Sequence, residues 1–223
     1  MTPSRLAVSL VWILITTMLI GCTSGSDNSE PPTAGAVQVQ TTGCLRTSIS
    51  SGVAVSRDLV LTAAHNVVGN TAVDIIDGSN RVHAGIPVVV DTNIDIALVA
   101  VPGAGLESIP LADRVGDVTA VALPLRDPVL RSVSLRRVVW ANTTDIYRER
   151  DVVKHALEID AEIQSGDSGS PVMNTAGEIV GIVVSSTKDR DDSIAYAVHF
   201  DEIRALVDSA EGLDAAVETR CWR

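Results

Sequence analysis

The sequence has few cysteines, few basic side chains, and no apolar run long enough for a membrane-spanning helix. Only three of its 223 residues are cysteine, and 17 Lys and Arg stand against 28 Asp and Glu, which gives a net charge of −11. Nucleic acids and anionic membrane surfaces attract positively charged proteins, so this charge argues against both as partners of the folded part. The sequence also has no internal repeat and no coiled-coil heptads.

The first 21 residues read as a signal peptide rather than as part of a folded domain. Arg5 is their only charged residue, and residues 6–20 form an apolar run that is shorter than the roughly 20 residues a membrane-spanning helix needs. The run leads into Leu19-Ile20-Gly21-Cys22, which resembles the lipobox of bacterial lipoproteins. The resemblance implies cleavage before Cys22 and lipidation of that cysteine. An uncleaved anchor and an ordinary signal peptide with a chance cysteine are the alternatives.

Residues 22–42 are expected to form a flexible tether, because residues 23–32 are polar, contain Gly and Pro, and lack periodicity. A single acyl chain binds membranes only marginally, whereas the bacterial lipoprotein modification supplies several chains, so it implies firm attachment. We therefore expect an exported protein, lipid-anchored to the bacterial cell envelope at the outer face of the cytoplasmic membrane or the periplasmic side of the outer membrane. The remaining residues 43–223 suffice for one sizeable core or for two small barrels.

Cys44 and Cys221 lie near the two ends of this folded part. Outside the cytoplasm a pair of cysteines is more often bonded than free, so we predict a disulfide that ties the C-terminal segment to the first strand. Two unpaired thiols are the alternative. Neither cysteine has a His neighbour at ligand spacing, which argues against a zinc site.

The folded part consists of short runs rich in Val, Ile, Ala and Thr, bounded by Gly, Asp, Asn and Pro. This pattern favours barrels or a sandwich over βαβ units. One helix is expected from about Asp201 to Gly212, because Ile203, Leu206 and Val207 fall on one face. The expected strands are 52–56, 59–62, 72–76, 82–90, 96–101, 118–123, 132–140, 152–159, 178–185 and 193–198.

Three motifs together indicate an activated serine. They are Thr62-Ala63-Ala64-His65, Asp95-Ile96-Ala97-Leu98 and Gly166-Asp167-Ser168-Gly169-Ser170-Pro171. A serine nucleophile needs a base to take its proton, and the base needs a carboxylate that holds its tautomer and stabilises the imidazolium. In this order and with these flanks, the motifs resemble the chymotrypsin-like (trypsin-like) serine peptidases, most closely their short bacterial branch.

The resemblance implies an all-β fold of two six-stranded antiparallel barrels, at about 43–115 and 116–223, with a C-terminal helix and a cleft between the barrels. The implied activity is that of a serine endopeptidase that acts on protein or peptide substrates without a cofactor or metal. His65 would be the general base, Asp95 the orienting carboxylate and Ser168 the nucleophile.

The N–H groups of Gly166 and Ser168 would form the oxyanion hole. Asp91 is a rival to Asp95, but the apolar run after Asp95 would hold that carboxylate at the mouth of a buried strand. Asp167 needs an internal partner, since a buried unpaired carboxylate is costly. By resemblance to bacterial relatives, Arg136 or Arg137 would supply it, and two solvent-facing arginines are the alternative.

Two substrate preferences follow from the segment before Ser168. Glu162 lies six residues earlier, where trypsin-like members carry the acid that binds Lys or Arg. The same segment resembles the HtrA branch, in which the residue at the position of Ile163 shapes an apolar pocket for small aliphatic side chains. By resemblance, the substrate-binding residues are Glu162, Ile163, Val184, Ser185, Ser186 and Ala195.

Two other classes of protein compete with this interpretation. A catalytically silent binding protein with the protease fold usually lacks a triad residue, and this chain lacks none. An α/β-hydrolase esterase would need a Gly-x-Ser-x-Gly elbow and the order Ser, Asp, His. Here the motif ends in Ser170, and His199 is the only histidine after Ser168.

Overall fold

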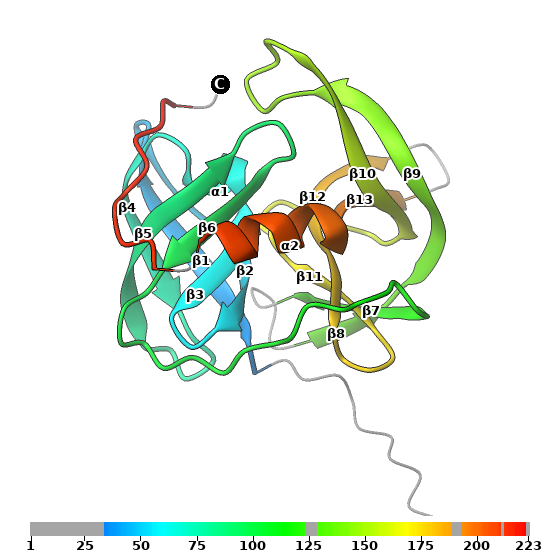
Figure 1. Cartoon of the computed structure of the whole chain (residues 1–223), viewed down its shortest axis with the longest axis horizontal. Helices are drawn as coiled ribbons and strands as arrows, with labels where there is room; N and C mark the ends of the chain where they lie inside the picture. The colour runs from blue at the N-terminus through cyan, green and yellow to red at the C-terminus, as the bar shows by residue number, and fades with distance from the viewer. Residues whose placement is uncertain (1–33, 124–128, 189–192, 211, 222–223) are drawn as a thin grey trace, which may run out of the picture.

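The computed structural model describes residues 34–123, 129–188, 193–210 and 212–221 (Figure 1). The proposed signal peptide, Cys22 and most of the predicted tether lie outside these residues. In the described part of the chain, no helix has the length and apolar character needed to span a membrane.

The first unit is a closed barrel of six antiparallel strands in the order β1-β2-β3-β6-β5-β4 (Figure 1). Strand β6 has the sequence Ile-Ala-Leu-Val-Ala and is buried along its whole length. The strands are β1 (Ala36–Gly43), β2 (Arg46–Ser56), β3 (Leu59–Ala63), β4 (Asn70–Ile76), β5 (Val82–Asp91) and β6 (Ile96–Ala100), and the short helix α1 (Ala64–Val67) follows β3.

Strand β1 corrects the predicted tether, because residues 36–42 belong to the barrel. It pairs with β2 on one side and β4 on the other. Val37 and Val39 are buried, whereas Gln38 and Gln40, which alternate with them, are partly exposed. The sequence alone does not distinguish this short alternation of polar and apolar residues from the polar segment before it, and pairing with β2 and β4 makes it part of the core.

The second unit is a seven-stranded antiparallel sheet in the order β8-β7-β11-β12-β13-β10-β9. The all-β fold class is confirmed, but this unit has seven strands rather than six because buried Val133 separates β8 from β9. The strands are β7 (Val118–Leu123), β8 (Val129–Ser132), β9 (Ser134–Thr144), β10 (Asp151–Asp160), β11 (Pro171–Asn174), β12 (Ile179–Lys188) and β13 (Ser193–His199).

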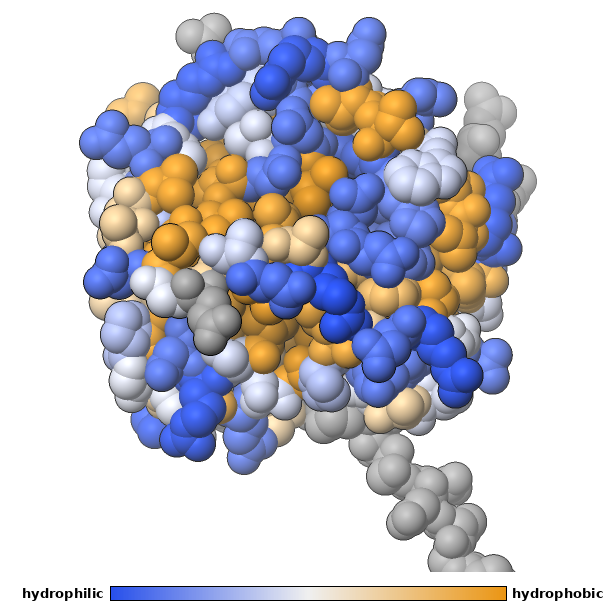
Figure 2. Space-filling model, viewed as in Figure 1, coloured by the Kyte–Doolittle hydropathy of each residue, from blue (hydrophilic) through white to orange (hydrophobic). Residues whose placement is uncertain are grey.

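Helix α2 (Phe200–Ser209) follows β13 and closes the fold, as predicted within a few residues. It buries Phe200 and Ile203, while Leu206 and Val207 pack partly buried against the same core. Figure 2 shows polar side chains where α2 crosses the molecule, with apolar residues on both sides of it. The helix therefore covers apolar surface with one face and presents its charged face to solvent.

Two later segments return to the first barrel. The segment after α2 is held there by hydrogen bonds from Val217 N–H to the Pro87 carbonyl (2.8 Å) and from Gly69 N–H to Thr219 Oγ1 (2.7 Å). The predicted disulfide between Cys44 and Cys221 is confirmed. The β9–β10 hairpin also arches across to the first barrel (Figure 1).

Candidate active site

His65 and Asp95 meet because strands β3 and β6 are neighbours. Ala63 at the end of β3 lies opposite Ile96 at the start of β6. Asp95 Oδ2 lies 2.8 Å from His65 Nδ1, and Asp95 Oδ1 accepts the backbone N–H of His65 at 2.9 Å. An ionised carboxylate only accepts hydrogen bonds, so the neutral ring of His65 carries its proton on Nδ1, and Nε2 is the nitrogen that can take up a proton.

The turn between β5 and β6 presents Asp95 rather than its rival Asp91. Asp91 Oδ1 accepts the N–H groups of Asn93 and Ile94, so this carboxylate stabilises the turn itself. Asp95 follows with φ of +67°, a left-handed conformation that non-glycine residues seldom adopt. Its carbonyl accepts Ala64 N–H at 3.1 Å. Both the backbone and the side chain of Asp95 are thus fixed against α1.

Ser168 comes from the second unit, and the first barrel holds its backbone beside His65. The Ser168 carbonyl accepts the N–H of Ser51 at 3.0 Å and the side-chain amide of Asn66 at 3.1 Å. Ser51 Oγ donates to the Gly166 carbonyl at 2.9 Å. The loop between β10 and β11 carries Ser168 and is called the serine loop below. Since Asn66 directly follows His65, these bonds place this loop against the helix that carries the histidine.

Gly169 allows this close approach. A Cβ atom at this position would lie 1.9 Å from the Ser51 carbonyl oxygen and 2.6 Å from Thr62 Oγ1. Its φ of +93° also suits glycine. The motif therefore needs glycine after Ser168 for packing against the first barrel as well as for the turn.

The backbone N–H groups of the serine loop fall into two sets. Those of Asp167, Gly169 and Ser170 donate to backbone carbonyls at 2.7–3.0 Å. Those of Gly166 and Ser168 have no acceptor among the residues that the structure describes. Gly166 has φ of +97°, which an L-side chain would strain. Two donors are thus left for an external acceptor, at the two positions predicted from the motif.

Asp167 is fully buried, and its Oδ2 accepts the N–H of Gln164 at 2.8 Å. The two arginines expected to pair with it both have carboxylate partners on β10. Arg136 forms an ion pair with Asp160. Arg137 donates to Glu158 through Nε and Nη2 at 3.1 and 3.0 Å.

The predicted substrate-binding residues divide into a buried and an exposed set. Ile163 and Ala195 are buried in one apolar cluster of the second unit, where Ala195 lies between Ile159 and Ser186 in the sheet. Glu162 is exposed, and its backbone carbonyl accepts Arg131 Nη1 at 2.6 Å. On β12, Val184 is half-buried, and Ser185 and Ser186 are exposed.

Sequence reasoning missed the polar residues that join the two units. Ser51 and Thr62 are fully buried, and Asn66 is nearly so. Thr62 Oγ1 donates to the Ser51 carbonyl at 2.7 Å and lies 3.1 Å from the Asn66 amide nitrogen. Thr62 and Asn66 flank His65 in the sequence, which is a usable signal, but the role of Ser51 depends on a contact more than a hundred residues away.

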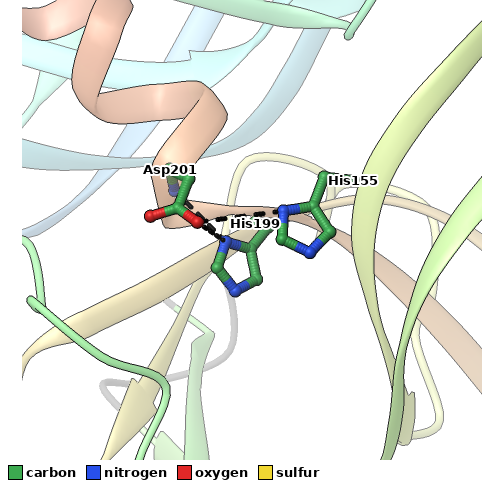
Figure 3. Close-up of side chains that lie close together, drawn as sticks. All are labelled: His155, His199 and Asp201. Atoms are coloured by element: carbon green, nitrogen blue, oxygen red, sulfur yellow. Dashed lines mark hydrogen bonds and ion pairs between the residues drawn. The ribbon is translucent and has the colours of Figure 1, made fainter.

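A second polar cluster lies at the start of α2. His155 Nδ1 and His199 Nδ1 face Asp201 Oδ2 at 3.9 and 3.4 Å (Figure 3). The two imidazoles stack at 3.9 Å between centroids, inside a row that begins with Trp140 and ends with Phe200. His199 Nδ1 also accepts Asp201 N–H at 3.2 Å.

This cluster resembles a metal-ligand set by composition but differs from one in geometry. The planes of His155 and His199 differ by only 25°, so their in-plane lone pairs run side by side rather than converging on one ion. Burial, and then the nearby His155, lower the pKa of His199, while Asp201 acts in the opposite direction. His199 is thus a neutral cap for α2.

Taken together, the two β units and the His65–Asp95 contact beside Ser168 are typical of the chymotrypsin-like serine peptidases. Residues 50–182 match the trypsin-like peptidase domain, and the chain belongs to this family.

Curated relatives of this chain are named as serine proteases. Serine protease Rv3671c of Mycobacterium tuberculosis is 26% identical over 152 residues, which cover 66% of this chain and 38% of that protein. A probable periplasmic serine endoprotease of the DegP-like type from Halomonas elongata is 31% identical over 143 residues, which cover 61% of this chain and 29% of that protein. The chain thus spans less than two fifths of the length of these curated relatives.

Solved structures share the fold. The crystal structure of the active form of the Rv3671c protease from M. tuberculosis superimposes with a TM-score of 0.78 at 22% identity, covering 86% of this chain and 90% of that one. The HtrA-type protease AlgW with a tripeptide gives a TM-score of 0.67 at 18% identity, covering 82% of this chain and 62% of that one.

Proposed function

We propose that the chain is a serine endopeptidase in which His65, Asp95 and Ser168 form the catalytic triad. The observation that carries the proposal is the paired contact of Asp95 with the ring and the backbone of His65, immediately beside the serine loop. A structural ion pair would need only one of these contacts. Both together fix the tautomer and the direction of the ring, which a general base requires.

The mechanism is acyl transfer. Ser168 Oγ attacks the peptide carbonyl while His65 Nε2 takes its proton, and Asp95 stabilises the imidazolium. The N–H groups of Gly166 and Ser168 donate to the oxyanion, each contributing about 3–4 kcal/mol in comparable sites. His65 then gives the proton to the leaving amine. A water molecule, deprotonated by His65, attacks the acyl-enzyme and releases the second product.

The preferred substrate residue before the scissile bond is small and aliphatic. Ile163 and Ala195 lie together in an apolar cluster, whereas Glu162 is exposed. A carboxylate in high-dielectric solvent attracts a substrate cation weakly, so Glu162 is poorly placed to select Lys or Arg. Of the two preferences predicted from the sequence, these positions therefore favour small aliphatic side chains over Lys and Arg.

A fluorophosphonate probe and an internally quenched peptide library test the activity. We expect the wild-type protein to be labelled and to cleave after small aliphatic residues, and Ser168→Ala to lose both properties. Ser165→Ala removes an exposed serine of the same loop and serves as the matched control. A folded wild type that is neither labelled nor active would point to a protease-fold binding protein, and cleavage after Lys or Arg that Glu162→Gln abolishes would overturn the substrate preference.

We also propose that Cys22 carries a lipid anchor that holds the enzyme at the cell envelope. The support is the lipobox-like segment in front of Cys22, together with a curated relative that is named as periplasmic. In a bacterial host, wild type should incorporate labelled palmitate and sediment with membranes, whereas Cys22→Ser should do neither. Incorporation of label into the Cys22→Ser protein would contradict the proposal.

A further inference from the structure

Ser51 of β2 directs both of its hydrogen-bond donors into the serine loop. Its backbone N–H donates to the Ser168 carbonyl at 3.0 Å, and its Oγ donates to the Gly166 carbonyl at 2.9 Å. The Ser51 carbonyl accepts Thr62 Oγ1 at 2.7 Å, which fixes Ser51 to the neighbouring strand β3. Because Ser51 is fully buried, its donors would be left unpaired if the loop moved away, and such a loss is costly.

The two carbonyls that Ser51 holds belong to the two residues that provide the proposed oxyanion donors. Gly166 and Ser168 each leave the N–H for an external acceptor and direct the carbonyl to Ser51. Within one residue, the N–H and the C=O are separated by only two rotatable backbone bonds. A hydrogen bond that fixes the carbonyl therefore also limits the directions in which the N–H of the same residue can point.

Gly166 especially needs a restraint of this kind. Its φ of +97° lies in a region that other residues avoid but that glycine enters and leaves freely. The peptide group after Gly166 is held on both sides, because its carbonyl accepts Ser51 Oγ and its N–H, which belongs to Asp167, donates to the Gln164 carbonyl at 3.0 Å. The second bond lies within the loop, whereas the first comes from the other unit of the protein.

The serine loop is also packed tightly against Ser51. Gly169 lies so close to the Ser51 carbonyl oxygen that a Cβ atom would not fit between them. On its other side, Gly169 N–H donates to the Val183 carbonyl at 2.7 Å. The loop is thus held between β2 and β12, with both of its bonded carbonyls within reach of Ser51.

We propose that Ser51 is a positioning residue that holds the two oxyanion donors in place, with its hydroxyl acting through Gly166. The inference rests on the proposed function. Oxyanion donors stabilise a transition state strongly when they already point to the site where the charge develops. Since Ser51 belongs to the first barrel and the donors to the second unit, the oxyanion hole is complete only when the two units are packed together.

Ser50 provides a matched control on the same strand. It is buried, and its Oγ donates to the Val39 carbonyl at 3.3 Å within the first barrel. Ser50→Ala and Ser51→Ala each remove one buried hydroxyl that donates to a backbone carbonyl, but only the carbonyl that Ser51 holds lies in the serine loop. Urea unfolding should show a similar loss of stability in the two variants.

The first test measures the order of the loop without any catalysis. Hydrogen exchange of backbone amides is followed by NMR in the full-length protein carrying Ser168→Ala, alone and combined with Ser51→Ala or Ser50→Ala. We expect the Asp167 amide, which shares a peptide group with the Gly166 carbonyl, to exchange about tenfold faster with Ser51→Ala and less than about twofold faster with Ser50→Ala. Unchanged exchange with Ser51→Ala, or equal acceleration in the two variants, would overturn the inference.

The second test separates kcat from KM in proteins that keep Ser168. The substrate is a peptide amide with a small aliphatic residue before the scissile bond, and active enzyme is counted by titration with a fluorophosphonate. We expect Ser51→Ala to lower kcat about tenfold and to change KM less than about twofold, because the oxyanion exists in the transition state and not in the bound substrate. This loss is smaller than the roughly hundredfold to thousandfold cost of deleting an oxyanion donor, since the Gly166 N–H is still present.

Ser50→Ala should keep both constants near the wild-type values. An unchanged kcat in Ser51→Ala, or an equal fall in Ser50→Ala, would contradict a role in the oxyanion hole. If the wild type has no peptidase activity, the proposed function fails, but the hydrogen exchange of Asp167 still decides whether Ser51 orders the serine loop.

Discussion

Asn66 fixes the backbone of the proposed nucleophile in much the same way as Asp95 fixes the ring of the proposed base. Its amide bridges Thr62 Oγ1 in the first barrel and the Ser168 carbonyl in the second unit. Because Asn66 and His65 are consecutive in α1, any shift of this helix moves the base and the serine loop together. The short helix α1 therefore sets the distance between the proposed base and the proposed nucleophile.

We predict that Asn66→Ala lowers kcat/KM about tenfold, because the Ser168 carbonyl loses one of its two hydrogen bonds to the first barrel and small misplacements of reacting groups are costly. The free energy of unfolding should fall by about 1–3 kcal/mol, since buried groups lose their partner. Peptide hydrolysis and urea unfolding measure the two effects. Asn142→Ala, at an exposed position of β9, is the control, and full activity of Asn66→Ala would refute the bridging role.

The candidate site shows what local sequence can predict at this scale. His65, Asp95 and Ser168 were predicted because each lies in a short segment whose flanking residues reflect its local geometry. The choice between Asp95 and Asp91 followed from the buried strand after Asp95, and the structure places Asp95 against His65. The role of Ser51 could not be predicted, because its partners Gly166 and Ser168 lie far away in the sequence.

At the scale of single elements, helix α2 depends on a histidine at its N-cap. His199 accepts a hydrogen bond from Asp201 N–H, as a neutral imidazole must in order to cap a helix. The same imidazole is buried and stacked on His155, so a proton on His199 would remove the acceptor and place a charge on a buried ring.

This arrangement predicts a loss of stability in acid. The pKa of His199 is lowered on folding, so the unfolded chain binds a proton first as the pH falls below the ordinary value of about 6.5. The contribution is fully present above that pH and is lost as the pH falls through the folded-state pKa. Its size is about 1.4 kcal/mol per unit of pKa difference.

His199→Asn provides the measurement, because asparagine retains an N-cap acceptor and cannot take up a proton in this range. The free energy of unfolding, measured at pH 7.5 and 5.5, should fall more steeply in the wild type than in the variant. Parallel pH dependences in the two proteins would show that His199 is not the responsible group.

The β-strands show where sequence patterns fail at this scale. Strand β6 is a continuous apolar run and was expected in nearly its observed position. Strand β1 was missed because its polar residues alternate with only a few apolar ones and its stability comes from pairing with β2 and β4. The length of the β9–β10 hairpin was likewise underestimated, because its tip is stabilised by the first barrel rather than by its own residues.

At the scale of the whole molecule, the disulfide closes a loop of 177 residues around both units. We predict that the double variant Cys44→Ser, Cys221→Ser has a free energy of unfolding about 2–5 kcal/mol lower than the wild type, mainly through the greater freedom of the unfolded chain. Urea unfolding of oxidised wild type and of the variant checks this. Reduced wild type should match the variant, and equal stability of the oxidised and reduced forms would contradict the prediction.

The contact between Tyr147 and the C-terminal segment also has a consequence for the order of events during synthesis. Tyr147 OH donates to the Arg220 carbonyl, and the Arg220 guanidinium lies over the Tyr147 ring. The segment that clamps the tip of the β9–β10 hairpin therefore leaves the ribosome after His65, Asp95 and Ser168. A nascent chain that already contains these three residues still lacks this segment, so the hairpin tip gains this restraint only when most of the polypeptide has been made.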